Sequence, residues 1–172
     1  MRALRDYYHR FLAGLGLLAG VSLGLIALTV TLDVGLRNLG WGNLPWLIEV
    51  AEYTLFVSTF LAAPWVLSLG AHVRVDVLVS ALPRDAAVAV DFLVDGIGLA
   101  IALVLLYFGF SAAADAHRIG SLIFKELVVP EWWLLSAIPV SAALLAIEFV
   151  FRIADRGGSP PDPMADVVQD GL

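Results

Sequence analysis

The stretch FLAGLGLLAGVSLGLIALTVTL, residues Phe11–Leu32, is one of four apolar segments in this chain that are each long enough to cross a bilayer. A membrane-spanning helix needs about 20 mostly apolar residues. The other three segments run over about Glu49–Leu69, Ala86–Phe110 and Trp132–Phe151. Four spans leave almost none of the 172 residues for a soluble domain. We therefore predict an all-α integral membrane protein, with a four-helix domain over residues 1–156 and a disordered, acidic cytoplasmic tail over residues 157–172.

The composition agrees with this class. Hydrophobic residues make up 60% of the chain and charged residues 15%, against about 45–50% and about 25% in soluble domains. A net charge of -6 argues against a nucleic-acid partner and leaves membrane lipid as the expected surroundings. There are no cysteines, which excludes disulfides, thiolate metal sites and cysteine nucleophiles.

Arginines ahead of the first apolar segment give the N-terminus the look of a signal peptide. That segment is longer than the roughly 7–15 residues of a signal sequence and has no small-residue cleavage pattern, so we interpret it as an uncleaved first span. The side that holds both termini and the second connector has seven arginines, whereas the other side has Arg37, Arg118 and Lys125. This bias predicts that both termini face the cytoplasm.

Three glycines, Gly16, Gly20 and Gly24, recur every four residues in the first span and so share one helix face. Such small-residue faces let a second helix approach closely, and we predict a packing face here. The alternative is that glycine is simply common in membrane helices.

Inserting an ionisable residue into hydrocarbon costs about 2.5–3.5 kcal/mol, so each such residue is a candidate for a functional role. Asp91 and Asp95 lie near the start of the third span. They could form a cation or proton site, but transport sites usually lie near the midplane. Because acidic residues are favoured at a helix N-terminus, we predict an interfacial or partner-facing role, with Arg74 and Arg84 as candidate ion-pair partners.

Acidic residues also open the second span. Glu49 and Glu52 share a helix face, and Arg37 is predicted on the same side of the membrane. This cluster could dock a partner or hold a connector, and simple capping by acids is the alternative. In the fourth span we predict an i, i+4 ion pair between Glu148 and Arg152, and a mid-span kink at Pro139.

Nothing in the chain indicates catalysis or a cofactor. The sequence has no phosphate-binding loop, dinucleotide fingerprint, zinc-protease motif or nucleophile elbow, and its loops are too short to enclose a substrate. His72 and His117 are predicted on opposite sides of the bilayer, about 30 Å apart, so they cannot ligate one haem iron.

Taken in order, the edges of the spans resemble a known family, the DctQ-type small permease subunit of tripartite ATP-independent periplasmic (TRAP) transporters. The resemblance covers Arg5 to Arg156. It rests on four motifs: Asp33-Val-Gly-Leu-Arg37, Trp46-Leu-Ile-Glu49-Val-Ala-Glu52-Tyr53, Gly70-Ala-His72-Val-Arg74-Val-Asp76, and Pro130-Glu-Trp132-Trp133 followed by Pro139.

The resemblance implies a multi-pass protein of the bacterial inner membrane that scaffolds a large permease subunit. That subunit would carry the substrate and sodium sites, and a periplasmic binding protein would deliver an organic acid such as a dicarboxylate, a sialic acid or a keto acid. The candidate partner-interface or structural residues are Gly16, Gly20, Gly24, Asp33, Arg37, Glu49, Glu52, His72, Arg74, Asp76, Asp91 and Asp95. Two alternatives are an autonomous small transporter or channel that uses Asp91 and Asp95, and a haem-bearing anchor of a redox complex.

Overall fold

The computed structural model describes residues 2–42, 44–69 and 84–156, which contain four helical segments long and apolar enough to cross a membrane. The first three are α1 (Arg2–Asn38), α2 (Trp46–Ser68) and α4 (Arg84–Ile119). The fourth combines a short α5 (Glu131–Leu135) with α6 (Ala137–Arg156). Between α4 and α5 lies an antiparallel hairpin of β1 (Leu122–Phe124) and β2 (Val128–Pro130), in which Ile123 pairs with Val129. The predicted four-span helical fold is confirmed, and the hairpin is an addition that the sequence did not indicate.

Two helices run further than their apolar segments. The α1 helix continues to Asn38, and α4 continues through the segment 111–119, which contains Asp115, His117 and Arg118. The spans predicted to end at Leu32 and Phe110 therefore end too early. Apolarity marks where a helix meets hydrocarbon, not where its backbone hydrogen bonds end. Each helix stops just before a glycine with positive φ: Gly40 at 71° and Gly120 at 69°. That left-handed conformation, which favours glycine, is the usual helix C-terminal stop.

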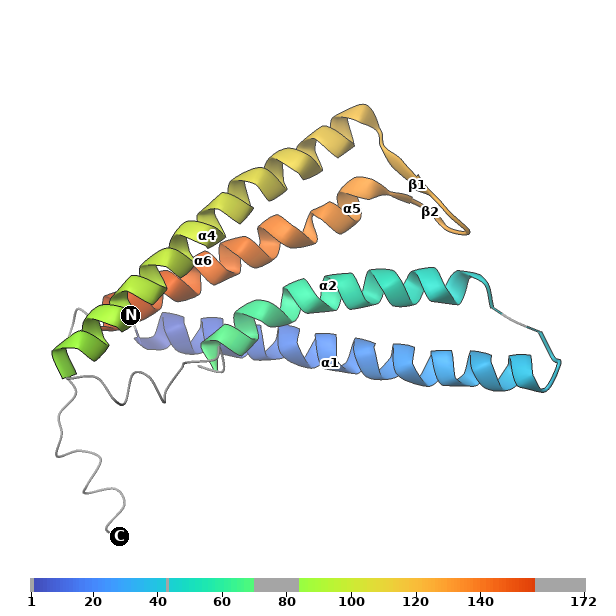
Figure 1. Ribbon diagram of the computed structural model, residues 1–172, viewed down its shortest axis with the longest axis horizontal. Coiled ribbons are helices and arrows are strands. Elements are labelled where there is room, and N and C mark those ends of the chain that lie inside the picture. The colour runs from blue at the N-terminus through green and yellow to red at the C-terminus, as the bar shows by residue number, and fades with distance from the viewer. Residues whose placement is uncertain (1, 43, 70–83, 157–172) are drawn as a thin grey trace, which may run out of the picture.

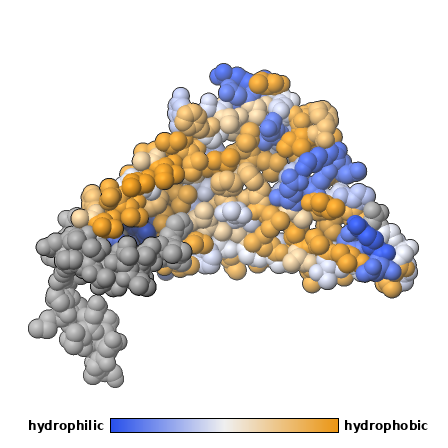
Figure 2. Space-filling model, in the orientation of Figure 1, coloured by the Kyte–Doolittle hydropathy of each residue, from blue (hydrophilic) through white to orange (hydrophobic). Residues whose placement is uncertain are grey.

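The helices form a single layer in the order α1, α2, α6, α4, each packed on its neighbour (Figure 1). The α1–α2 and α4–α6 pairs converge at the end where the chain begins and spread apart toward the hairpin, which reaches from α4 back to the start of α2 (Figure 1). The surface along the helices is largely apolar, and hydrophilic residues gather at the ends (Figure 2). The layer therefore has the surface of a protein embedded in a membrane.

Small residues set the close helix contacts. A Cβ at Gly16 would overlap the Trp65 ring of α2, and a Cβ at Gly98 would overlap the Phe149 ring of α6. Gly16 therefore lies at a close contact between α1 and α2. At Gly20 and Gly24 an added Cβ would meet nothing within 4 Å among the described residues.

The predicted mid-span kink at Pro139 is wrong in position. Pro139 is the third residue of α6, and the helix is interrupted before it, at Ser136 between α5 and α6. Proline has no N–H to donate to the residue four positions earlier, so the break falls on its N-terminal side. The proline in a helix interior is Pro64, which is buried within α2.

Candidate functional site

Two groups of polar residues hold the layer together, one at each end. The hairpin cluster consists of Glu49 and Glu52 of α2 and the hairpin turn Lys125–Leu127. The buried network consists of Tyr8 and His9 of α1, Asp95 of α4, and Glu148 and Arg152 of α6. Between them these groups involve every spanning helix.

Glu49 organises the hairpin cluster. It lies in the first turn of α2, and the residue is only 8% exposed. The backbone N–H groups of Glu126 and Leu127 donate to its two oxygens, at 2.7 and 2.9 Å. One buried carboxylate thus satisfies two donors of the hairpin turn and fixes the α4–α5 connector over the start of α2.

A second pair supports the same contact from the surface. The Lys125 ammonium lies 2.7 Å from a carboxylate oxygen of Glu52, and 5.7 Å from the centre of the Tyr53 ring. The hydrogen bond to Glu52 raises the pKa of Lys125. Both partners are well exposed, so this ion pair contributes little to stability compared with Glu49.

Asp33 closes the α1–α2 connector. Arg37, one turn later, approaches its carboxylate at 3.0 Å, and the N–H of Leu44 donates to the other oxygen at 2.8 Å. The structure therefore brings Arg37 to Asp33, and brings Glu49 and Glu52 to the hairpin. Arg37, which we predicted to cluster with the two glutamates, pairs instead with Asp33.

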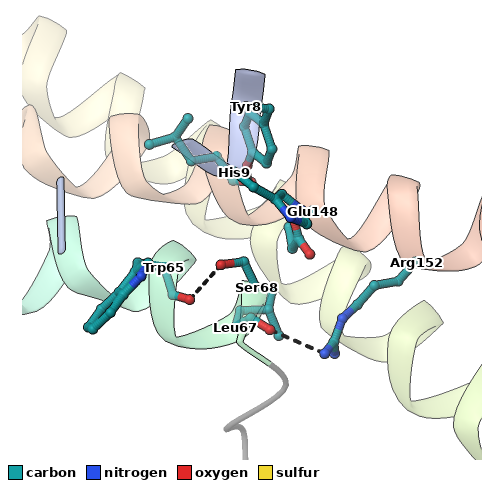
Figure 3. A network of polar contacts seen from close by, with 8 residues as sticks. Tyr8, His9, Trp65, Leu67, Ser68, Glu148 and Arg152 are labelled. Carbon is teal, nitrogen blue, oxygen red and sulfur yellow. Dashed lines mark hydrogen bonds and ion pairs between the residues drawn. The ribbon is translucent and has the colours of Figure 1, made fainter. Parts of the chain in front are cut away.

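The buried network joins α1, α4 and α6, and Arg152 also reaches α2. Figure 3 shows its members from α1 and α6 beside Leu67 of α2. His9 Nε2 lies 3.4 Å from a carboxylate oxygen of Glu148, and an Arg152 guanidinium nitrogen lies 3.7 Å from Asp95. Arg152 also donates to the carbonyl oxygen of Leu67 in α2 at 3.2 Å. The Tyr8 hydroxyl donates to the carbonyl oxygen of Leu144 in α6 at 2.6 Å.

This arrangement corrects the ion pair predicted within the fourth span. Glu148 and Arg152 each pair with a different helix, Glu148 with His9 and Arg152 with Asp95. Both acidic residues are 2% exposed. Burying a charge is costly unless it is paired, and the packing places each carboxylate beside a basic side chain of another helix. The contact of His9 with Glu148 is not a hydrogen bond among the described residues. The sequence offered a weak signal for His9, which lies just ahead of an apolar run, and none for the cross-helix pairing.

The network also locates Asp95 inside the layer. Asp91, one turn earlier on α4, is partly exposed and also has an interaction partner. The side chains of Arg74 and Arg84, their predicted partners, lie outside the described set. So do the predicted candidates His72, Arg74 and Asp76, and the tail at 157–172.

No metal or haem site emerges from the described part of the chain. It contains no group of three or more His, Cys, Asp or Glu residues placed to hold a metal ion. His117 instead packs edge-on against Trp132, with ring centres 5.2 Å apart.

A layer of four apolar helices with polar clusters at its ends defines a multi-pass membrane protein. The family described as tripartite ATP-independent periplasmic transporters, DctQ component, matches residues 26–156. The chain therefore belongs to this family, and the resemblance is confirmed. Gly16, Gly20, Gly24 and His9 precede the matched region. Curated proteins gave no match.

Proposed function

We propose that this protein is the small membrane subunit of a TRAP-type secondary transporter in a bacterial inner membrane. It holds a large permease subunit that imports an organic acid, such as a dicarboxylate, a sialic acid or a keto acid, with sodium as the coupling ion. A periplasmic binding protein delivers the substrate to the pair. The observation that carries this proposal is membership of the DctQ family over residues 26–156.

The layer supports a scaffolding role. Its buried carboxylates Asp95 and Glu148 lie 3.7 and 3.4 Å from basic side chains of other helices, and its hairpin is fixed by Glu49. These contacts join separate parts of the chain at both ends of the layer, which favours a stiff arrangement of the helices. A stiff body suits a subunit that anchors the static part of a permease while the transport part moves.

An autonomous transporter fits these contacts less well. Midplane ion sites in transporters are typically built from broken helices and inward polar groups. In the described residues the ionisable groups instead gather at the two ends of the layer, where they pair with one another. We assign the protein no catalytic role and no cofactor.

The test is assembly and transport with a separate large permease. The tagged chain, extracted in mild detergent, should co-purify with a co-expressed multi-span TRAP permease. Proteoliposomes containing both subunits should take up substrate when the binding protein and a sodium gradient are supplied, and the permease alone should be much less active. Uptake by the small chain alone, or full uptake by the permease alone, would contradict the proposal.

A further inference from the structure

Two hollows flank one row of side chains on α4, near the hairpin end of the layer. The row consists of Leu106, Phe110 and Ala114, which are four residues apart on one helix face and line both hollows. The hollow between α4 and α6, which we call the inter-helix groove, has a volume of about 580 Å³. The hollow on the other side of the row, the edge groove, has a volume of about 490 Å³. Helix α4 forms one edge of the layer, with α6 as its neighbour (Figure 1).

The walls of both grooves are accessible from outside the chain. Phe110, in the shared row, is 67% exposed. Val140 in the inter-helix groove is half-exposed, and Leu103 and Tyr107 in the edge groove are exposed as well. A molecule beside α4 therefore reaches both grooves without any rearrangement of the layer.

The inter-helix groove offers almost only apolar contacts. Its lining contains one hydroxyl group, on Ser136, and that hydroxyl already donates to the Trp133 carbonyl oxygen at 2.6 Å. At the hairpin end of the groove the rings of His117 and Trp132 pack edge-on. A hydrocarbon chain needs no hydrogen bonds, so it satisfies such a lining fully.

The length of the inter-helix groove matches one leaflet of a bilayer. Residues 96–114 carry no charge, and at about 1.5 Å per residue they span about 30 Å, the thickness of the hydrocarbon. Asp115 and Arg118 therefore lie at the headgroup level. The groove runs from Leu106 to His117 on α4, which is about 16 Å, or half of that thickness. A helix of another protein would cross both leaflets, whereas an acyl chain ends after one.

The edge groove ends in two opposite charges. Asp115 and Arg118 both line it, three residues apart on α4. Both are exposed, and neither has an ion pair or a side-chain hydrogen bond within the described part of the chain. An acid and a base side by side above an apolar groove fit the ammonium and the phosphate of a zwitterionic headgroup. A purely anionic headgroup would instead place a like charge beside Asp115.

We propose that the two grooves bind one phospholipid with a primary ammonium group, such as phosphatidylethanolamine, from the leaflet on the hairpin side. Its two acyl chains lie on either side of the row formed by Leu106, Phe110 and Ala114. Its phosphate accepts from the Arg118 guanidinium, and its ammonium donates to the Asp115 carboxylate. The site lies on this chain alone and does not depend on the proposed function.

Photo-crosslinking with lipid tests the occupant. The full chain is reconstituted in vesicles that contain phosphatidylethanolamine with a diazirine in its acyl chain, and the labelled positions are mapped by mass spectrometry. The labels should concentrate on residues 103–114 of α4 and on Val140 and Ala143 of α6. Unlabelled phosphatidylethanolamine should compete better than phosphatidylcholine, whose methylated ammonium cannot donate a hydrogen bond, and better than phosphatidylglycerol, which has no ammonium.

Two substitutions separate the headgroup contacts. Arg118→Gln should reduce the labelling about fivefold, the change expected for one arginine at a lipid surface. Asp115→Ala should instead abolish the preference for phosphatidylethanolamine over phosphatidylcholine. Arg10→Gln and Asp6→Ala, exposed at the opposite end of the layer, are the matched controls and should change neither quantity.

Filling the grooves tests the acyl-chain contacts. Ala114 lines both grooves, so Ala114→Phe should displace the chains and remove most of the labelling. Ala112→Phe is the control, because Ala112 is exposed and lines neither groove. Thermal unfolding in detergent checks that both variants fold, and the two surface substitutions at the headgroup keep the test valid if Ala114→Phe does not.

Three outcomes decide the assignment. Labels spread evenly over all four spanning helices, or equal competition by the three lipids, would show bulk lipid only and overturn it. Labels that disappear from the grooves when a large permease is co-expressed would mean that a protein covers them, which also overturns it. Failure of the chain to retain a permease, with the labelling as expected, would overturn the proposed function and support the lipid site.

Discussion

The Ser141 hydroxyl of α6 donates a hydrogen bond of 2.5 Å to the carbonyl oxygen of Phe60 in α2. That oxygen lacks its usual helical partner, because Pro64, four residues later, has no N–H. Ser141 is 1% exposed, so the contact lies inside the layer. A neighbouring helix thus compensates for the proline, as membrane helices require when a backbone acceptor is released in hydrocarbon.

Ser141→Ala should destabilise the protein by about 0.6–1.7 kcal/mol, since it removes one interhelical hydrogen bond within the membrane. The same change in a Pro64→Ala background should cost less, because the substituted alanine would donate its own N–H to the Phe60 carbonyl oxygen. Denaturant titration in mixed micelles of the unaltered protein, the two single variants and the double variant gives the coupling energy. Strict additivity of the two changes would show that the proline and the serine act independently.

Glu49→Gln and Glu52→Gln form a matched pair in the hairpin cluster. Loss of the Glu49 charge weakens two backbone hydrogen bonds to a buried carboxylate, at about 1.5–3 kcal/mol for bonds to a charged group. Loss of the Glu52 charge should cost much less, because an exposed ion pair contributes little to stability. Hydrogen exchange at the amides of Glu126 and Leu127 should accelerate strongly in the first variant and little in the second. Equal exchange rates at these amides in both variants would show that Glu49 does not hold the hairpin turn more strongly than Glu52.

Two nearby glycines of α4 test the tight contact with α6. Gly98→Leu must displace the Phe149 ring and should cost about 1–3 kcal/mol through overpacking. Gly96→Leu points into space that is empty within 4 Å and should leave stability unchanged or raised, since leucine favours helix. Thermal unfolding in detergent compares them. Similar melting temperatures for the two variants would mean that α4 and α6 are not packed as closely as described.

Arg152→Gln should be strongly destabilising. It leaves the buried Asp95 carboxylate without this cation, and breaking such a pair typically costs about 3–5 kcal/mol. Asp95→Asn combined with Arg152→Gln should recover part of the loss. Arg10→Gln, at an exposed position, is the control. An Arg152→Gln protein as stable as the unaltered protein would show that the pair is solvated in the membrane.

The hairpin should also respond to alkaline pH. Because its hydrogen bond to Glu52 raises the pKa of Lys125, the pair stabilises the folded hairpin below the usual lysine pKa of about 10.4. That contribution is lost as the pH rises through the raised value. NMR titration of the Lys125 side chain should give a pKa that falls toward the usual value in Glu52→Gln. An unchanged pKa would show that the hydrogen bond is absent in solution.

The sequence by itself determined the class of protein and the number of spans. Length and apolarity decide whether a helix can cross hydrocarbon, and both are local properties of a segment such as Phe11–Leu32. The charge motif Asp33–Arg37 is equally local, because residues four apart on a helix face one another. The helix stops at Gly40 and Gly120 also have a local cause in glycine conformation, although apolarity alone set the ends too early.

The tertiary structure decided which residues pair across helices. Glu148 has Arg152 one helical turn away, yet it pairs with His9 near the start of the chain, while Arg152 pairs with Asp95. Glu49 reaches the hairpin turn rather than Arg37. The partner of a buried charge, or of a carbonyl oxygen without a helical donor, is set by which side chains the packing places beside it. The packing of the helices, which no periodicity encodes, therefore fixed the buried network and the Ser141–Phe60 bond.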